Sequence, residues 1–208
     1  MFTRLAYCRS AGFHRALRIS ALTVTFLLQS NPVSSGPVLL HGLSSGQIVD
    51  AVGRLEVAFS PNQGSEALVI RVIDSARKEL RVMAYSFTSA PVTQALIAAS
   101  KRGVDIKVVV DEKNNLSQDA PKARAALSGL LSAGIDVRTI NAYPIHHDKV
   151  IVVDRKTVQL GSFNYSAAAA NRNSENVLVN WENPQLALVY LRHFTRNYAQ
   201  SVAYRIRY

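Results

Sequence analysis

The chain has 208 residues, of which 24 are Lys or Arg and 14 are Asp or Glu, so its formal net charge is +10. This length provides for one domain with a hydrophobic core and leaves little room for a second. With 48% apolar and 18% charged residues, the composition excludes a disordered chain. It contains no uninterrupted run of about 18 apolar residues, which excludes an integral multi-span membrane protein. The positive balance favours polyanionic partners, either nucleic acid or anionic lipid head groups.

The first 35 residues have the layout of an export signal. The positive residues Arg4, Arg9, Arg15 and Arg18 precede the apolar run from Ile19 to Leu28, and small residues follow around Ser34. No acidic residue occurs before Asp50. We predict a signal peptide over residues 1–35, a periplasmic or secreted mature chain, and contact with the membrane only during export. An Arg-rich organelle transit peptide, or a mis-assigned start, would have the same layout.

Removal of this segment changes both the charge and the thiol content of the chain. Four positive charges leave with it, so the remainder carries 20 minus 14, or +6. The only cysteine, Cys8, leaves as well. The mature chain therefore offers no thiol for a disulfide, a nucleophile or a zinc site.

Strand and helix patterns alternate over the first half of the remaining chain. Residues 36–53 are rich in Gly, Ser and Pro, and we interpret them as a linker to a domain over residues 54–208. We expect strands at 54–59, 80–85, 104–110 and 136–140, and helices over 60–78, 88–103 and 120–132. The helix limits follow from Ser60-Pro61-Asn62 and Thr88-Ser89 before Pro91 at two N-termini, and from Gly103 and Gly134 at two C-termini. This alternation predicts a mostly parallel sheet with helices packed on it.

The spacing of the elements changes after Ala142. Strands are expected at 149–153, 158–161 and 176–180, with a hairpin at Asp154-Arg155-Lys156 and a last helix beginning near Asn183-Pro184. We find no internal repeat. The sequence therefore predicts an α/β fold of one domain, with a mixed, mostly parallel β-sheet and helices packed on both faces.

Two adjacent strand ends carry the polar residues best suited to chemistry. His147 and Lys149 are two residues apart, so both side chains lie on one face of the strand. Ser162 and Asn164 repeat this spacing on the next strand. An imidazole, a fixed cation, a hydroxyl and an amide suit the binding of a tetrahedral phosphoryl group. Glu175 begins the following strand, and we expect it to accept the second N–H of the His147 ring.

Other polar residues near the motif have structural interpretations. Asp154 is seven positions from His147, an odd offset that places its side chain on the opposite face, so we predict a turn or ion-pair role. His146 also points away from His147, which favours a structural or surface role. A metal cluster of His146, His147 and Asp148 is disfavoured, because consecutive strand residues do not converge on one ion.

The run His147-x-Lys149-x4-Asp154-x6-Gly161-Ser162-x-Asn164 resembles the signature of the phospholipase D superfamily, and is most similar to that of its small, exported bacterial endonucleases. The likeness extends from about Glu56, through 83–88 and 101–105, to the terminal helix. It implies that His147 forms a phosphohistidine, that Lys149, Ser162 and Asn164 hold the phosphoryl oxygens, and that Glu175 supports His147. It also implies that neither a metal ion nor any other cofactor is required.

The superfamily uses two such motifs in each active site, whereas this chain has one. The resemblance therefore implies a homodimer in which two copies of His147 meet across a two-fold axis. The chemistry favours the same arrangement, since one group must attack the phosphorus while another protonates the departing oxygen.

We predict a metal-independent phosphodiesterase, an endonuclease that cleaves DNA with little sequence preference; whether it also cleaves RNA stays open. The alternatives are a phospholipid phosphodiesterase and a basic nucleic-acid-binding module without catalysis. Tyr85, Ser86 and Phe87, at the carboxyl end of a strand, are expected to line the pocket.

The segment from Asn183 to Tyr208 interleaves basic and aromatic residues and contains no acid. Its members are Arg192, Arg196, Arg205 and Arg207 with Tyr190, Tyr198, Tyr204 and Tyr208. Such a segment tracks a strand of nucleic acid in some proteins. A helix that packs its aromatic side chains on the core and exposes its arginines explains the pattern equally well.

Overall fold

The computed structural model describes residues 46–206. The predicted signal peptide, Cys8 and residues 36–45 of the predicted linker lie outside the described residues. Residues 46–53 form neither helix nor strand. Asn180 Nδ2 donates to the carbonyl of Val52 at 3.0 Å, and Asn183 Nδ2 donates to that of Asp50 at 3.2 Å. The described end of the predicted linker is therefore held against the domain.

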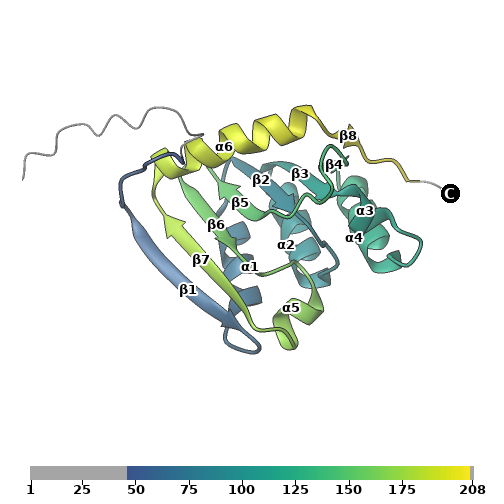
Figure 1. The fold of residues 1–208 in the computed structure, drawn as a ribbon, viewed down its shortest axis with the longest axis horizontal. Coiled ribbons are helices and arrows are strands. Elements are labelled where there is room, and N and C mark those ends of the chain that lie inside the picture. The colour runs from purple at the N-terminus through teal and green to yellow at the C-terminus, as the bar shows by residue number, and fades with distance from the viewer. Residues whose placement is uncertain (1–45, 207–208) are drawn as a thin grey trace, which may run out of the picture. The chain divides into compact units, whose positions relative to one another are not determined.

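One mixed sheet of eight strands forms the centre of the domain (Figure 1). The strands are β1 Arg54–Ser60, β2 Glu79–Ala84, β3 Asp105–Asp111, β4 Asp136–Ile140, β5 Lys149–Val153, β6 Thr157–Gly161, β7 Glu175–Trp181 and β8 Val202–Ala203. Their order across the sheet is β1-β7-β6-β5-β2-β3-β4-β8. The predicted α/β class with a mixed sheet is confirmed.

The sheet is less parallel than we predicted. Only β2 with β3 and β3 with β4 pair in parallel, whereas the other five neighbouring pairs are antiparallel. The first strand lies at the edge of the sheet and pairs antiparallel with β7. Strand β5 inserts between β6 and β2, so a parallel half meets an antiparallel half there.

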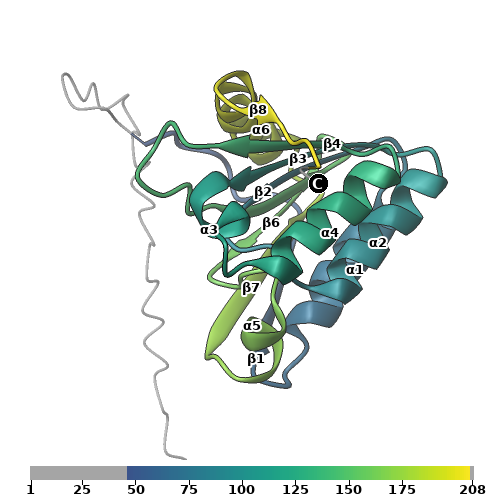
Figure 2. The same cartoon turned by 90° about the vertical axis from the view of Figure 1, so that its right-hand side faces the viewer.

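Helices cover both faces of the sheet, as predicted. They are α1 Ser65–Ser75, α2 Ala90–Lys101, α3 Glu112–Leu116, α4 Pro121–Ser132, α5 Ala167–Asn171 and α6 Pro184–Ala199. Figure 2 shows α1, α2 and α4 on one side of the sheet and α6 on the other. Leu68 of α1, Leu96 of α2 and Leu127 of α4 belong to one buried cluster. Leu191 and Phe194 of α6 belong to a second cluster on the other face.

Local capping chemistry explains most helix limits. Ser89 caps α2 by accepting from the N–H of Val92, and Asn183 caps α6 by accepting from that of Leu186. The first helix differs from our prediction, because it begins at Ser65 rather than near Ser60. Asn62 and Gly64 have φ of 57° and 89°, which are not helical, so residues 61–64 form a turn after β1 instead.

Three short elements were not predicted: α3, α5 and β8. The two helices have five residues each and the strand has two, too few to create a periodic apolar pattern. Within residues 46–206, no helix has the length and apolar character needed to cross a membrane.

Candidate active site

The predicted site residues lie at one edge of the sheet because of how four neighbouring strands run. Strand β5 is antiparallel to both β2 and β6, and β6 is antiparallel to β7. The beginnings of β5 and β7 therefore lie beside the ends of β2 and β6. This topology brings His147 and Lys149 to the same edge as Ser162 and Glu175.

His147 is exposed and lies in the irregular segment that precedes β5. Its ring packs on Tyr85, with the ring centroids 4.7 Å apart. The chain beside it is held by a buried carboxylate, since Asp111 Oδ2 accepts the backbone N–H of His146 at 2.8 Å. The imidazole is thus accessible to a ligand while its backbone is anchored.

Lys149 is the first residue of β5 and is buried. Its Nζ donates to the carbonyl of His147 at 2.8 Å and lies 5.3 Å from the centroid of the Tyr85 ring. Burial lowers the pKa of Lys149, and the charges of Asp148 and Glu175 act in the opposite direction. The ammonium is therefore a fixed cation with part of its hydration removed, and it gains most from an added anion.

The side chains of Ser162 and Glu175 are hydrogen-bonded to each other, which we did not predict. Ser162 Oγ donates to Glu175 Oε2 at 2.6 Å and accepts from the backbone N–H of Asn176 at 3.1 Å. The other carboxylate oxygen of Glu175 accepts from Asn173 Nδ2 at 3.0 Å. Among the described residues, the structure contains no hydrogen bond between Glu175 and His147, and the Glu175 carboxylate accepts from Ser162 and Asn173 instead.

Among the predicted site residues, Asn164 has a buried side-chain oxygen that accepts no hydrogen bond within the described residues. It follows the buried Phe163 on the chain segment after β6, and its Oδ1 is buried with no hydrogen-bond partner in the described structure. A buried amide without a partner costs free energy unless a ligand satisfies it. The side chain is therefore available to a substrate group.

A second polar cluster behind the motif joins the His147 segment to α6. Asp148 Oδ2 lies 2.9 Å from His193 Nε2 and 3.5 Å from His146 Nδ1. Burial lowers the pKa of His146, an effect that the nearby carboxylates partly offset. His146 and Asp148 therefore serve this cluster, while His147 packs on Tyr85. No group of three or more potential metal-ligating side chains occurs within residues 46–206.

Sequence reasoning missed Asp111 and His193. The position of Asp111 at the carboxyl end of a parallel strand was a usable signal, since polar groups at that edge often serve a site. Nothing in the local pattern singled out His193, because its role depends on how α6 crosses the sheet.

Asp154 lies in the hairpin between β5 and β6. Its carboxylate accepts the backbone N–H groups of Arg77, Lys78 and Glu79 at 2.9, 2.8 and 2.9 Å. Burial by itself would raise the pKa of Asp154, but these three donors outweigh it and the pKa is lowered. Asp154 therefore contacts the backbone before β2 and at its beginning, at the opposite end of β5 from His147.

The aromatic residues 190, 194, 198 and 204 of the C-terminal segment pack inward, whereas Arg207 and Tyr208 lie outside the described residues. Phe194 is buried, and Tyr190 and Tyr198 pack against the same cluster. Tyr204 is buried and bonds Ser128 Oγ through its hydroxyl at 3.0 Å. The arginines 192, 196 and 205 are exposed. This arrangement favours the packing interpretation of the segment.

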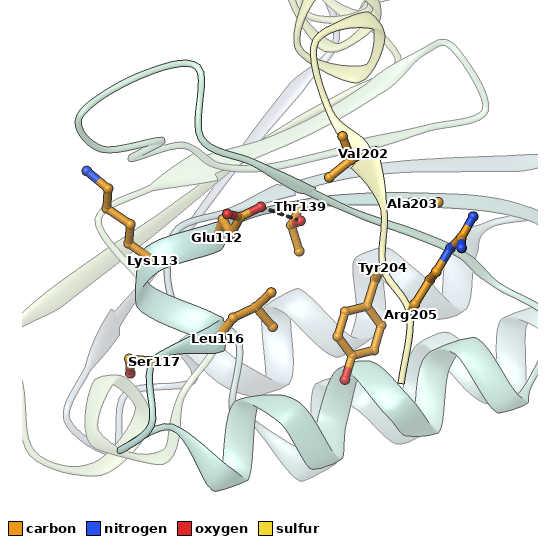
Figure 3. A pocket seen from close by; sticks show the side chains of 9 residues that line it. All are labelled: Glu112, Lys113, Leu116, Ser117, Thr139, Val202, Ala203, Tyr204 and Arg205. Carbon is orange, nitrogen blue, oxygen red and sulfur yellow. Dashed lines mark hydrogen bonds between the residues drawn. The ribbon is translucent and has the colours of Figure 1, made fainter. Parts of the chain in front are cut away.

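A cavity of about 550 Å³ lies between α3 and this segment (Figure 3). Glu112 and Thr139 form one wall, where Thr139 Oγ1 donates a hydrogen bond to Glu112 Oε2 at 3.0 Å. Tyr204 and Arg205 form another wall. It contains none of the residues predicted from the sequence to carry chemistry.

An exposed imidazole, a partly desolvated ammonium, and a hydroxyl and a free amide at the neighbouring strand end are groups whose chemistry suits an anionic phosphoryl ligand, so this strand edge is the candidate active site. The family described as "Cardiolipin synthase, PLD-like domain" matches residues 69–198. The chain is 36% identical over 173 residues to "Phospholipase D" of Rickettsia felis, covering 83% of this chain and 82% of that one. It is 29% identical over 136 residues to "Mitochondrial cardiolipin hydrolase" of Mus musculus, covering 65% and 58%.

Among solved structures, the chain is similar to Nuc from Salmonella typhimurium, a phospholipase D family member. The TM-score is 0.71 at 44% sequence identity, over 74% of this chain and 99% of that one. The chain belongs to the phospholipase D superfamily, whose members act on phosphodiester bonds.

Proposed function

We propose that the protein is an endonuclease that cleaves DNA and RNA through a phosphohistidine on His147, without a metal ion, at a site shared by two copies of the chain. The observation that carries the proposal is that the exposed His147 ring and the buried Lys149 ammonium both lie against the Tyr85 ring. A nucleophile and a desolvated cation at this spacing stabilise a negatively charged phosphoryl group as charge develops on it.

The reaction proceeds in two balanced steps. First, a ring nitrogen of His147 forms a bond to phosphorus while the bond from phosphorus to the leaving oxygen breaks, and that oxygen takes a proton from a second imidazole. Then a water oxygen bonds to phosphorus, the N–P bond breaks, and the second imidazole takes a proton from the water. In this account, Lys149 and Asn164 hold the phosphoryl oxygens, and Glu175 orients Ser162.

The second imidazole is His147 of another copy. An exposed apolar row on the edge strand β1 supports this assignment: Leu55, Val57 and Phe59 are 63%, 50% and 49% exposed. Phe59 pairs in register with Asn176, whose backbone N–H donates to Ser162. An exposed apolar row on an edge strand next to a site that lacks one of its two required groups favours self-association at that site.

The charge of the chain supports a nucleic-acid substrate. The net charge of +10, or +6 without residues 1–35, attracts a polyanion, and the resemblance of the His147 motif to that of exported bacterial endonucleases favours the same substrate. A phospholipid phosphodiesterase is the second candidate, because relatives named phospholipase D and mitochondrial cardiolipin hydrolase are similar over most of the domain.

The decisive experiment incubates the protein lacking residues 1–35 with plasmid DNA, RNA and phosphatidylcholine vesicles in parallel, all in EDTA. We expect cleavage of both nucleic acids, and the loss of that cleavage in His147→Ala and His147→Asn. His146→Asn is a matched control that changes the neighbouring imidazole. Lipid turnover without nucleic-acid cleavage would overturn the proposal, as would His147→Ala protein that is well folded and keeps more than a few per cent of the activity.

The same proposal places the mature protein in the periplasm or outside the cell, on the pattern of residues 1–35. Expression of the full chain in a Gram-negative bacterium, followed by fractionation and N-terminal sequencing, tests this. Uncleaved protein confined to the cytosol would contradict it.

A further inference from the structure

A second cavity opens in the helical layer between the beginnings of α2, α4 and α5. Its volume is about 690 Å³. We refer to it as the three-helix cavity. Small apolar residues form much of its wall: Ala90, Pro91, Ala125, Ala126, Ala167 and Ala168. None of the predicted catalytic residues lines it.

The charged residues of the three-helix cavity are both cations. Lys122 of α4 and Arg172, just after α5, line it and are exposed, and no Asp or Glu is among the lining residues. Neither cation forms an ion pair with an acidic side chain of residues 46–206. Glu66, which accepts from Ser89 Oγ at 2.8 Å, does not line the cavity. The cavity therefore favours an anionic ligand.

The same two chain segments build this cavity and the active site. The backbone N–H groups of Thr88 and Ser89, both in the cavity wall, donate to the carbonyl of Tyr165 at 2.8 Å each. Thr88 follows Tyr85, which packs on His147, by three residues. Ser166, also in the wall, follows Asn164 by two residues, and its N–H donates to the Asn164 carbonyl at 2.7 Å. A ligand in the cavity thus lies beside the segments that hold the scissile group.

The chemistry of the wall distinguishes between parts of a ligand. The first turns of α2 and α4 lie at the cavity and add the positive ends of two twelve-residue helix dipoles to the two side-chain charges. No aromatic side chain lines the cavity, so bases have no surface on which to stack. Cations, hydroxyls and short apolar side chains suit a phosphate and its sugar, which every nucleotide shares.

We propose that the three-helix cavity binds a phosphate and sugar of the nucleic-acid strand flanking the phosphodiester that is cleaved at His147. This inference rests on the proposed nuclease function. It assigns Lys122 and Arg172 to backbone contacts that do not depend on base sequence. Such contacts account for binding of a nucleic-acid strand without sequence preference.

Binding is measured in a His147→Ala background, so that the oligonucleotide stays intact. We compare it with the triple variant that also carries Lys122→Ala and Arg172→Ala, using a single-stranded probe of about twelve nucleotides over a range of salt concentrations. Two lost phosphate contacts reduce the slope of log K against log salt by about 1.4, since each contact contributes about 0.7 on a single strand. At about 50 mM salt, Kd should rise roughly tenfold or more.

Matched controls separate this effect from a general loss of charge. Lys78→Ala with Lys101→Ala removes two exposed cations that do not line the cavity, and should leave the salt slope closer to that of the parent. Ala125→Glu adds a carboxylate to the cavity wall and should weaken binding as the double alanine variant does. An unchanged slope in both the Lys122/Arg172 and the Ala125 variants would overturn the inference.

The remaining outcomes distinguish this inference from the proposed function. Cleavage of nucleic acid that depends on His147 but is insensitive to Lys122 and Arg172 would refute the cavity assignment alone. For an otherwise wild-type enzyme, the ratio of oligonucleotide cleavage to hydrolysis of bis(p-nitrophenyl) phosphate should fall in the Lys122/Arg172 variant, because the small diester has no flanking phosphate. If these two residues instead control binding to vesicles of anionic phospholipid and not to the oligonucleotide, the cavity is a lipid site and the inference is wrong.

Discussion

Asp154→Asn tests whether the aspartate of the motif stabilises the fold rather than taking part in chemistry. The carboxylate accepts three backbone N–H groups, two on Oδ1 and one on Oδ2. The amide of Asn keeps one acceptor oxygen and turns an NH2 group toward the N–H of Arg77. Asp154 has φ of 49°, a conformation that Asn adopts readily, so the substitution adds little backbone strain.

The expected loss of stability follows from the one bond that Asn cannot make. A hydrogen bond to a charged group contributes about 1.5–3 kcal/mol, and partial exposure of this carboxylate favours the lower end, about 1.5–2 kcal/mol. In a domain of this size, about 1 kcal/mol shifts Tm by about 2–4 °C, so thermal unfolding should occur about 3–8 °C lower.

The same substitution should leave the chemical step nearly intact below Tm. Strand β5 has five residues at about 3.3 Å each, which separates Asp154 from Lys149 by roughly 16 Å. We therefore expect kcat within a few-fold of wild type, measured by plasmid cleavage at a temperature where both proteins are folded. An unchanged Tm together with complete loss of cleavage would refute the reasoning.

The pH dependence provides an independent check on Asp154. Its folded pKa lies below the ordinary value of about 3.9, so the stabilisation is present above about pH 4 and is lost as the pH falls through the folded pKa. The Tm values of wild type and Asp154→Asn should therefore converge in acid. A constant difference from neutral pH down to about pH 2 would show that the carboxylate charge is not the cause.

Further predictions concern the site and its second copy. Lys149→Met should lower turnover by about two to three powers of ten, because it removes one donor that stabilises the transition state, and should not lower Tm, because an apolar side chain replaces a buried cation. Kinetics and calorimetry on one sample measure both effects, and near wild-type turnover would contradict the prediction. Co-refolding equal amounts of wild-type and His147→Ala chains should leave about one quarter of the activity, the share of wild-type dimers under random pairing; retention of about one half would indicate independent sites. Val57→Glu places a charge in the exposed row of β1 and should yield monomers of low activity by sedimentation, whereas an intact dimer would exclude this face from the interface.

The sequence by itself determined the local features of this protein. Ser89 and Asn183 are both N-caps, and Asp154 to Lys156 form the predicted hairpin, because capping and turn formation depend on residues within one or two turns of each other. Strand limits were predicted to within a residue or so for the same reason. The residue types of His147 and Lys149 also indicate the chemistry of the site. The strand alternation from which we placed both side chains on one face does not apply, because His147 lies in an irregular segment before β5.

Only the tertiary structure decided which strands pair and which side chains meet. The pairing of β1 with β7 joins segments more than a hundred residues apart, and no periodic pattern specifies such a partner. The same is true of Glu175, which bonds Ser162 rather than His147, and of His193, which reaches Asp148 from α6. The three-helix cavity exists because three helix beginnings converge on one side of the sheet, and that convergence depends on the packing of the whole domain.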